Sequence, residues 1–243
     1  MQDWHPSPLR HIRLAVAAGL AAMIGVGVPA AQSQAIIDFA KVDPALRDYG
    51  YVDRAALWQT EVISVCWENP DAANAQARLW VEAAIEATWD KASQIQSTGW
   101  SACRPDFGGL RILVVDAADA PHAVVGRDAA GARPGMWLNF TFANWGGAYC
   151  QDRLRACIES IAVHEFGHTL GFAHESLRDD APPECKTRAD VLKDKSRPVQ
   201  GEILTSYDAN SVMNYCNTLY NNGGKLSSLD QQAVQKLYGP PRR

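Results

Sequence analysis

Three histidines stand at fixed offsets in the segment HEFGHTLGFAHE, which covers residues 164–175. Residues four apart on a helix lie on the same face, so His164 and His168 can present two imidazole nitrogens to one metal ion. Glu165 is rotated by one residue and can reach a water molecule without taking a coordination position. The spacing therefore predicts a helix that carries a metal site.

A third ligand follows the end of that helix. Gly171 can adopt a left-handed backbone that ends the helix and turns the chain back, which brings His174 to the metal. Three nitrogen ligands leave the fourth tetrahedral position open to water, as in catalytic zinc sites. We therefore expect His164, His168 and His174 to bind Zn²⁺. The alternative is a helix whose histidines only pack or face solvent, but three of the four histidines beyond residue 35 lie in this segment.

Such a site predicts hydrolysis. Zinc acidifies its water, and Glu165 takes the proton while the water attacks a carbonyl that the metal polarises. Glu165 then delivers the proton to the leaving amine. The expected activity is that of a zinc-dependent endopeptidase with Glu165 as general base. Replacing Glu165 should spare metal binding and abolish turnover, whereas replacing a histidine should reduce both.

The first 35 residues have the pattern of a secretory signal peptide. A charged start that includes Arg10 and Arg13 precedes an uncharged run over residues 14–28, and small residues follow. The run is shorter than the roughly 20 residues needed to span a bilayer, which disfavours the alternative of a retained membrane anchor. Cleavage after Ala30 and cleavage after Ala35 both fit. The expected destination is extracellular or periplasmic.

All six cysteines lie beyond the predicted signal peptide. An even number of cysteines in an exported chain indicates disulfides, and six cysteines allow 15 pairings. We predict that neighbours along the chain pair. Zinc ligation by cysteine is not expected, because no two are separated by only two to four residues. The predicted bonds are Cys66–Cys103, Cys150–Cys157 and Cys185–Cys216.

Composition excludes some partners and sets the domain organisation. A formal net charge of −4 provides no basic field for nucleic acid, so we expect none as a partner. The chain shows no internal repeat, and 47% of its residues are hydrophobic, which suits one domain with a real core. We expect residues 1–35 to be the signal peptide, 36–60 a short prosegment or N-terminal arm, and 61–243 the catalytic domain. A monomer without a stable membrane anchor is expected.

Hydrophobic periodicity predicts the main elements. In the helix at 73–93, Val81, Ile85 and Trp89 share one face, and Trp80 and Trp89 are expected in the core rather than at a ligand site. His122 follows a proline in a predicted loop and is taken as an ordinary surface residue. The remaining expectations are strands at 62–67, 110–115 and 136–142, helices at 157–171 and 228–238, and loops at 126–135 and 178–207.

The segment around the histidines resembles the metzincin clan of metalloproteases, whose extended motif is H-E-x-x-H-x-x-G-x-x-H. Within the clan it looks most like the astacin family, because Glu175, Ser176 and Arg178 are similar to the astacin continuation. Residues 207–215, YDANSVMNY, resemble the astacin Met-turn, and residues 226–239 are similar to the closing helix. The resemblance implies an α+β fold with a twisted mixed sheet, an active-site helix and a C-terminal helix.

The resemblance also implies roles for individual residues. Met213 would form an apolar floor beneath the metal, and Tyr215 would approach zinc and stabilise the oxyanion. From the residues alone, Met213 is a core residue and Tyr215 a buried tyrosine. An extended substrate would lie antiparallel to an edge strand, for which residues 135–140 are the candidate; the alternative is that they form an ordinary paired strand.

The chain departs from the family pattern in three respects. The prosegment that usually supplies an aspartate to zinc has only about 25 to 30 residues available here, too few for a globular prodomain. Asn214 replaces the residue usual in animal astacins, and six cysteines exceed the common pattern. A neighbouring metzincin family therefore stays an alternative. The aspartates available in the prosegment are Asp38, Asp43, Asp48 and Asp53.

Two other functions fit the same site. One is a secreted zinc-site protein that binds peptide or glycan without cleaving it, although none of the motif residues is lost. The other is a metal-dependent hydrolase of a non-peptide amide, because the same activated water can attack other carbonyls. Product analysis separates these functions by new peptide termini, another product or none.

Overall fold

The computed structural model describes residues 51–52, 54–117, 121–145, 148–188, 202–203 and 205–242. The predicted signal peptide and the four candidate aspartates of the prosegment lie outside these residues. No helix in the described part of the chain is long and apolar enough to cross a membrane.

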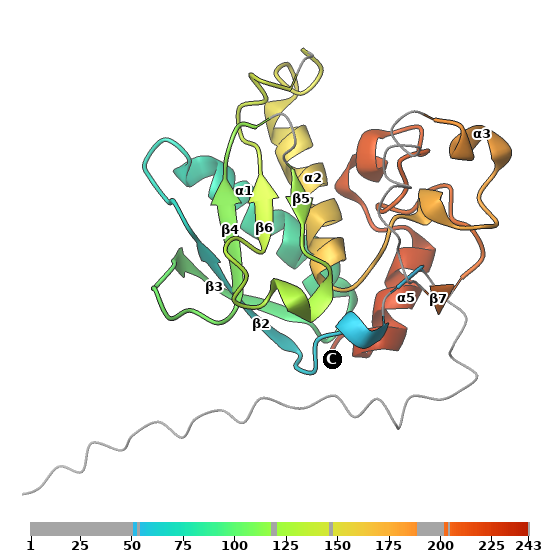
Figure 1. Ribbon diagram of the computed structural model, residues 1–243, viewed down its shortest axis with the longest axis horizontal. Coiled ribbons are helices and arrows are strands. Elements are labelled where there is room, and N and C mark those ends of the chain that lie inside the picture. Colours follow the sequence, from blue (N-terminus) through green and yellow to red (C-terminus); the bar gives the residue numbers. More distant parts are fainter. Residues whose placement is uncertain are drawn as a thin grey trace, which may run out of the picture. The chain divides into compact units, whose positions relative to one another are not determined.

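A five-stranded mixed sheet forms one half of the fold (Figure 1). Its strand order is β3-β2-β4-β6-β5, in which β5 is antiparallel to its neighbour and the others are parallel. The sheet confirms the predicted mixed arrangement. The strands are β2 (Val62–Trp67), β3 (Gln96–Ala102), β4 (Leu110–Val114), β5 (His122–Ala123) and β6 (Met136–Leu138).

The structure corrects the sequence prediction at the two outer strands. β3 was not predicted, because its sequence QSTGWSA is polar and only Ser97 and Trp100 are buried. β5 has two residues, too few for a periodic signal, and it places His122 in a strand instead of the predicted loop. Outer strands of a sheet bury less surface than central ones, so their apolar pattern is weak.

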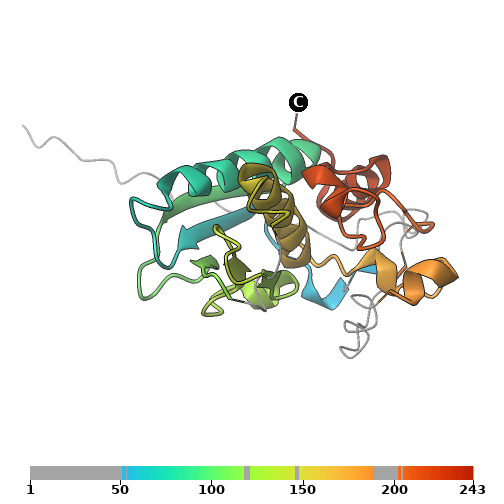
Figure 2. The same ribbon diagram turned by 90° about the horizontal axis from the view of Figure 1, so that it is seen from above.

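Two helices cover one face of the sheet (Figure 2). Helix α1 (Ala75–Ile85) continues into a π-helical turn, Glu86–Asp90, and α2 (Leu154–Thr169) packs across it. Trp89 is fully buried, and its indole N–H donates to the carbonyl of Val163 in α2 at 2.8 Å. This contact confirms that Trp89 is a core residue and shows how the π-helical turn at the end of α1 holds α2.

The chain after α2 contains short elements and one longer helix. The predicted loop at 178–207 contains α3 (Pro183–Lys186) and β7 (Glu202–Ile203), which pairs with β1 (Tyr51–Val52). Helix α5 (Ser228–Tyr238) has the predicted bounds. The side chain of Tyr238 donates to the carbonyl of Leu170 at 2.7 Å, so α5 satisfies a backbone oxygen at the end of α2.

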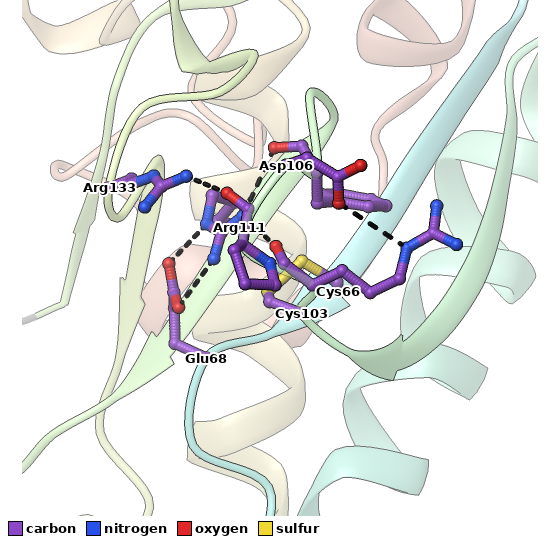
Figure 3. Close-up of a disulfide and its surroundings, with 9 residues drawn as sticks. Cys66, Glu68, Cys103, Asp106, Arg111 and Arg133 are labelled. Atoms are coloured by element: carbon purple, nitrogen blue, oxygen red, sulfur yellow. Dashed lines mark hydrogen bonds and ion pairs between the residues drawn. A yellow bond between two sulfur atoms is a disulfide. The ribbon is translucent and has the colours of Figure 1, made fainter.

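All three predicted disulfides are present. Figure 3 shows the bond between Cys66 in β2 and Cys103, the residue that follows β3. Beside it, the Arg111 guanidinium donates to both carboxylate oxygens of Glu68, at 2.5 and 3.0 Å. This ion pair lowers the pKa of Glu68. The disulfide ties β2 to the end of β3, and the ion pair ties the end of β2 to Arg111 in β4.

Candidate active site

Helix α2 and the chain just beyond it bring the three predicted histidines together. His164 and His168 lie one turn apart on α2, as the four-residue spacing predicted. The Nε2 atom of His174 lies 3.0 Å from that of His164 and 2.9 Å from that of His168. Among the described residues, these three form the group whose ligand atoms can hold a metal ion.

The turn that brings back His174 has the predicted cause. Gly171 has φ +94°, a left-handed conformation that residues with a side chain rarely adopt. Its N–H donates to the carbonyl of His168, and the N–H of Phe172 donates to that of Gly167 at 3.1 Å. These bonds close the end of α2 in the manner of a helix C-cap.

Two backbone carbonyls orient the histidine rings. Nδ1 of His164 lies 2.8 Å from the carbonyl oxygen of Val212, and Nδ1 of His168 lies 2.7 Å from that of Phe172. A carbonyl oxygen only accepts, so each Nδ1 carries the proton and each Nε2 directs a lone pair towards His174. Burial and the neighbouring imidazoles also hold the pKa of His168 well below its usual value, which keeps that ring neutral.

The residues fit a zinc ion. Three neutral imidazole nitrogens form a donor set that zinc prefers, and tetrahedral zinc would separate them by about 3.3 Å. The observed separations are only slightly shorter. Hydrogen bonds from ligand Nδ1–H groups to carbonyls are the usual outer support of such sites. Converging lone pairs without a cation between them would repel each other.

The support of His164 extends to the last helix. Asp230 accepts from the backbone N–H of Val212 at 2.9 Å and from the hydroxyl of Ser211 at 2.7 Å. The same carboxylate forms the capping box of α5 with Ser227. Sequence reasoning did not identify Asp230 or Val212 as parts of the site. The pattern Ser-x-x-Asp at 227–230 is a capping signal, but nothing in it points to His164.

Met213 packs against α2 beside Gly167. Its side chain is 2% exposed. A Cβ atom added at Gly167 would lie 2.5 Å from the sulfur of Met213 and 3.0 Å from Trp89. Gly167, one of the unspecified positions of the motif, was not identified from the sequence. Its missing side chain allows Met213 to approach the helix this closely.

Glu165 and Tyr215 lie next to the histidines. Glu165 follows His164 on α2 and is 6% exposed. The ring centroid of Tyr215 lies 4.1 Å from that of His174 and 5.7 Å from that of His164, and the rings of Tyr215 and His164 are nearly parallel. Tyr215 therefore packs on the imidazoles, although it lies far from them along the chain.

The residues that follow His174 form a buried polar cluster. The N–H of Glu175 donates to the carbonyl of Met213 at 3.0 Å, and its carboxylate accepts from the N–H of Asp208 at 2.8 Å. Arg178, with a fully buried side chain, lies 3.2 Å from the same carboxylate and 2.7 Å from that of Asp180. Burial raises the pKa of Glu175 to about 7, although Arg178 opposes this shift. The cluster joins the turn after His174 to the Met213 segment.

The candidate substrate strand at 135–140 was wrong. β6 pairs with β4 on one side and with β5 on the other, so the alternative of an ordinary paired strand holds. The strand at this end of the sheet order is β5. His122 in β5 stacks on Trp137 of β6, with ring centroids 4.0 Å apart. β5 has only two residues, too few for hydrophobic periodicity to predict it. Without β5, β6 was taken as the edge strand.

Comparisons with known proteins agree with this geometry. Residues 154–239 match the model of Astacin, a peptidase family. The structure of myroilysin has a TM-score of 0.53 and 17% identity, over 80% of this chain and 100% of myroilysin. High choriolytic enzyme 1, a hatching enzyme zinc-protease from Oryzias latipes (medaka fish), has a TM-score of 0.50 and 19% identity, over 80% of this chain and 95% of that enzyme. No curated protein sequence matches the chain.

The similarity to myroilysin covers 80% of the chain, while the family match covers the segment that contains the histidines, the Met213 turn and α5. The solved structures agree with the α+β fold, and the family match implies protein or peptide substrates. The match over residues 154–239 supports a zinc metalloendopeptidase similar to the astacin family. The solved structures show that the chain has the fold of such proteases.

Proposed function

We propose that this chain is a secreted endopeptidase in which His164, His168 and His174 hold the zinc. Glu165 is the general base and Tyr215 stabilises the oxyanion. The observation that carries the proposal is the convergence of three Nε2 atoms, two of them oriented by carbonyls, next to a buried glutamate. A helix that merely packs histidines has no need of this convergence.

The reaction divides between the metal and the side chains. When bound, zinc supplies Lewis-acid chemistry that polarises the scissile carbonyl and acidifies a water. Glu165 takes the proton from that water as its oxygen forms a bond to the carbonyl carbon. The hydroxyl of Tyr215 donates a hydrogen bond to the developing oxyanion. Glu165 then gives its proton to the amide nitrogen as the C–N bond breaks, so that a carboxylic acid and an amine leave.

The substrate is proposed to bind as an added strand. β5 is the terminal strand of the sheet order, and an extended peptide can pair with such an edge through its backbone. The histidines belong to α2, the helix that contacts β5 and β6 at this end of the sheet. An extended peptide along β5 would therefore present its backbone carbonyls, one after another, near the zinc ligands. Backbone pairing of this kind favours a peptide over another amide.

The proposal of secretion depends on the N-terminal pattern and the cysteines. Residues 1–35 have the features of a signal peptide, and three disulfides suit an oxidising compartment. Residues 36–60 are proposed as a short prosegment or arm, and 61–243 as the catalytic domain, acting as a monomer without a stable membrane anchor. Purification of the exported protein followed by N-terminal sequencing would locate the mature end.

The test is cleavage of a mixed peptide library by the zinc-loaded chain lacking residues 1–35. It is run beside Glu165→Gln and Glu159→Gln, a matched control because Glu159 lies on the same helix but pairs with Arg155 at the surface. Mass spectrometry reads new peptide termini, and zinc content is measured for each protein. The wild type and Glu159→Gln should cleave, whereas Glu165→Gln should hold zinc and not cleave.

Other outcomes each remove a part of the proposal. Equal cleavage by Glu165→Gln would exclude the general-base role. Zinc binding without cleavage by the wild type would favour a silent binding protein, and cleavage of a non-peptide amide alone would favour the other hydrolase. Full zinc content in His168→Ala would contradict the assignment of the ligands.

A further inference from the structure

One disulfide ends at the residue next to Tyr215. Cys216 follows Tyr215 directly, and its partner Cys185 is buried in α3. α3 packs against the 3-10 helix Glu175–Leu177, which begins at the residue after His174. The bond therefore links the two chain segments whose rings, those of Tyr215 and His174, lie 4.1 Å apart.

We propose that the Cys185–Cys216 disulfide is a positioning device for Tyr215, which holds the phenol where it meets the developing oxyanion. The inference rests on the proposed role of Tyr215 and goes beyond it. A hydroxyl that donates to an oxyanion must be held close to its final place, because misplacement by about 1 Å can reduce the rate roughly 100-fold.

The chain is well anchored before Tyr215. Asn214 is fully buried, and its amide nitrogen donates to the hydroxyl of Tyr207 at 2.9 Å and to the carbonyl of Asp208 at 2.7 Å. Its amide oxygen accepts from the N–H of Cys216 at 2.9 Å. These bonds hold the backbone up to the amide of Cys216 without the help of the disulfide.

The chain is less enclosed after Tyr215. Thr218 and Leu219 are exposed, and Leu219 has 61% of its surface in solvent. The next buried residue is Asn221, in the 3-10 helix Tyr220–Gly224, which packs against α2. Between Asn214 and Asn221, the disulfide is the covalent bond that ties this more exposed segment to α3.

The zinc ligands are held by other groups. His164 and His168 are on α2 and are oriented by the carbonyls of Val212 and Phe172, both upstream of Tyr215. Loss of the disulfide should therefore leave zinc binding and substrate affinity in place. It should lower the rate of the step in which the oxyanion forms. A bond that merely stabilised the fold would not separate these quantities.

A double-mutant cycle tests the proposal. kcat, KM and zinc content are measured for Cys185→Ser with Cys216→Ser, for Tyr215→Phe, and for all three changes together. Removing the disulfide should lower kcat roughly 10- to 100-fold at unchanged KM and zinc content. In the Tyr215→Phe background, where no hydroxyl remains to be positioned, removing it should have no further effect on kcat.

A matched control is available in the sheet. The Cys66–Cys103 bond closes a loop with a sequence separation of 37, against 31 for Cys185–Cys216, so both should stabilise the folded chain to a similar extent. Cys66 lies near the end of β2, and Cys103 directly follows β3 (Figure 3). Changing both cysteines of this pair to serine should lower stability and leave kcat unchanged, measured per zinc-loaded molecule.

The outcomes distinguish the inference from the proposed function. If Tyr215→Phe retains the wild-type kcat, the role of Tyr215 fails, and the inference fails with it. If Tyr215→Phe is impaired but loss of the disulfide is not, only the inference fails. Equal losses of kcat in both backgrounds would also overturn it. If the serine pair does not fold, the pair Cys185→Ala with Cys216→Ala replaces it, and failure of both to fold with zinc would assign the bond to folding instead.

Discussion

Helix α2 lies between two regions that are stabilised in different ways. The sheet region, residues 62–138, is built from the mixed sheet and an apolar core in which Ile63, Val65 and Ile112 are fully buried. The C-terminal region, residues 175–238, has little regular structure before α5 in its described part. It is held by buried polar groups, above all Glu175, Arg178, Asp208, Asn214 and Asp230.

The two regions have different roles: the sheet region supports α2, and the C-terminal region positions groups around the histidines. The sheet region needs only to hold α2 firmly, and apolar packing does this without directional bonds. The C-terminal region must place a carbonyl against His164, a methionine under the helix and a tyrosine over two imidazoles. Hydrogen bonds and a disulfide have the directional geometry that such placement requires. Changes in the two regions should therefore separate stability from activity.

The largest effect is expected in the C-terminal region, for Arg178→Met. This change leaves the carboxylate of Glu175 buried without its cation, and should lower the free energy of unfolding by about 3 to 5 kcal/mol. Activity per folded molecule should fall as well, because Glu175 anchors the Met213 segment. Urea denaturation and peptide cleavage measure the two losses. Adding Glu175→Gln should recover part of the stability, and a loss below about 1 kcal/mol for Arg178→Met would show that the cluster is not needed.

A similar loss of stability without loss of activity is expected in the sheet region. Ile112→Ala removes a fully buried side chain from β4 and should lower the free energy of unfolding by about 2 to 4 kcal/mol. The zinc content and kcat of the folded protein should stay at wild-type values. A fall in kcat of the kind expected for Arg178→Met would show that the two regions are not separable.

Sequence patterns succeeded mainly where packing is apolar and periodic. They predicted β2 and α5 with the observed bounds and the buried face of α1, because each repeats at the period of its structure. They failed at β3, whose side chains are polar, and at β5, which has two residues. Neither strand has enough buried surface to leave a pattern.

The same distinction applies to the candidate site: contacts between residues close in sequence were predictable, and contacts that depend on tertiary structure were not. The offsets of the motif predicted the meeting of the histidines, because all three are local to one helix and one turn. The place of Met213 and Tyr215 came from the family resemblance, since no spacing rule connects them with α2. The support by the Val212 carbonyl and Asp230 could not be predicted, because it joins backbone groups that meet only through tertiary contacts.

A smaller effect should sharpen the comparison at the contact between the two regions. Gly167→Ala places a methyl group against the sulfur of Met213 and the ring of Trp89, and should cost about 1 to 2 kcal/mol of stability. Zinc affinity should fall too, because Met213 must move. Gly108→Ala is the control, since nothing lies within 4 Å of its added Cβ, and its stability should stay within about 0.5 kcal/mol of wild type. Equal unfolding midpoints and zinc affinities for both variants would contradict the close packing of Met213.

The smallest effect concerns pH and the end of α1. Burial raises the pKa of Asp90 to about 6 from its ordinary value of 3.8, although Ser97 hydrogen-bonds to it. The folded chain therefore binds this proton more tightly than the unfolded chain, so the contribution of Asp90 is present below about pH 4 and is lost as the pH rises through about 6. Because Asp90 is partly exposed, the loss should be only roughly 1 to 2 kcal/mol.

The variant Asp90→Asn should lack this part of the pH dependence. Unfolding free energies at about pH 4 and pH 7 are compared for the wild type, for Asp90→Asn and for Asp106→Asn, a change at an exposed site. The wild type and Asp106→Asn should lose more stability over this range than Asp90→Asn. Parallel profiles for all three proteins would show that Asp90 titrates in the same way in the folded and unfolded chains.

The capping box of α5 has a consequence for how much the chain can vary in length. Asp230 accepts hydrogen bonds from Ser211 and Val212 as well as from Ser227, so both ends of the intervening stretch are held by one carboxylate. Residues added at the exposed positions near Leu219 would enlarge a surface loop whose ends stay where they are. A single residue inserted between Ser227 and Asp230 would instead separate the cap from its partner and release the carbonyl that orients His164. We therefore expect insertions to be tolerated near Leu219 but not between Ser227 and Asp230, a few residues further along the chain.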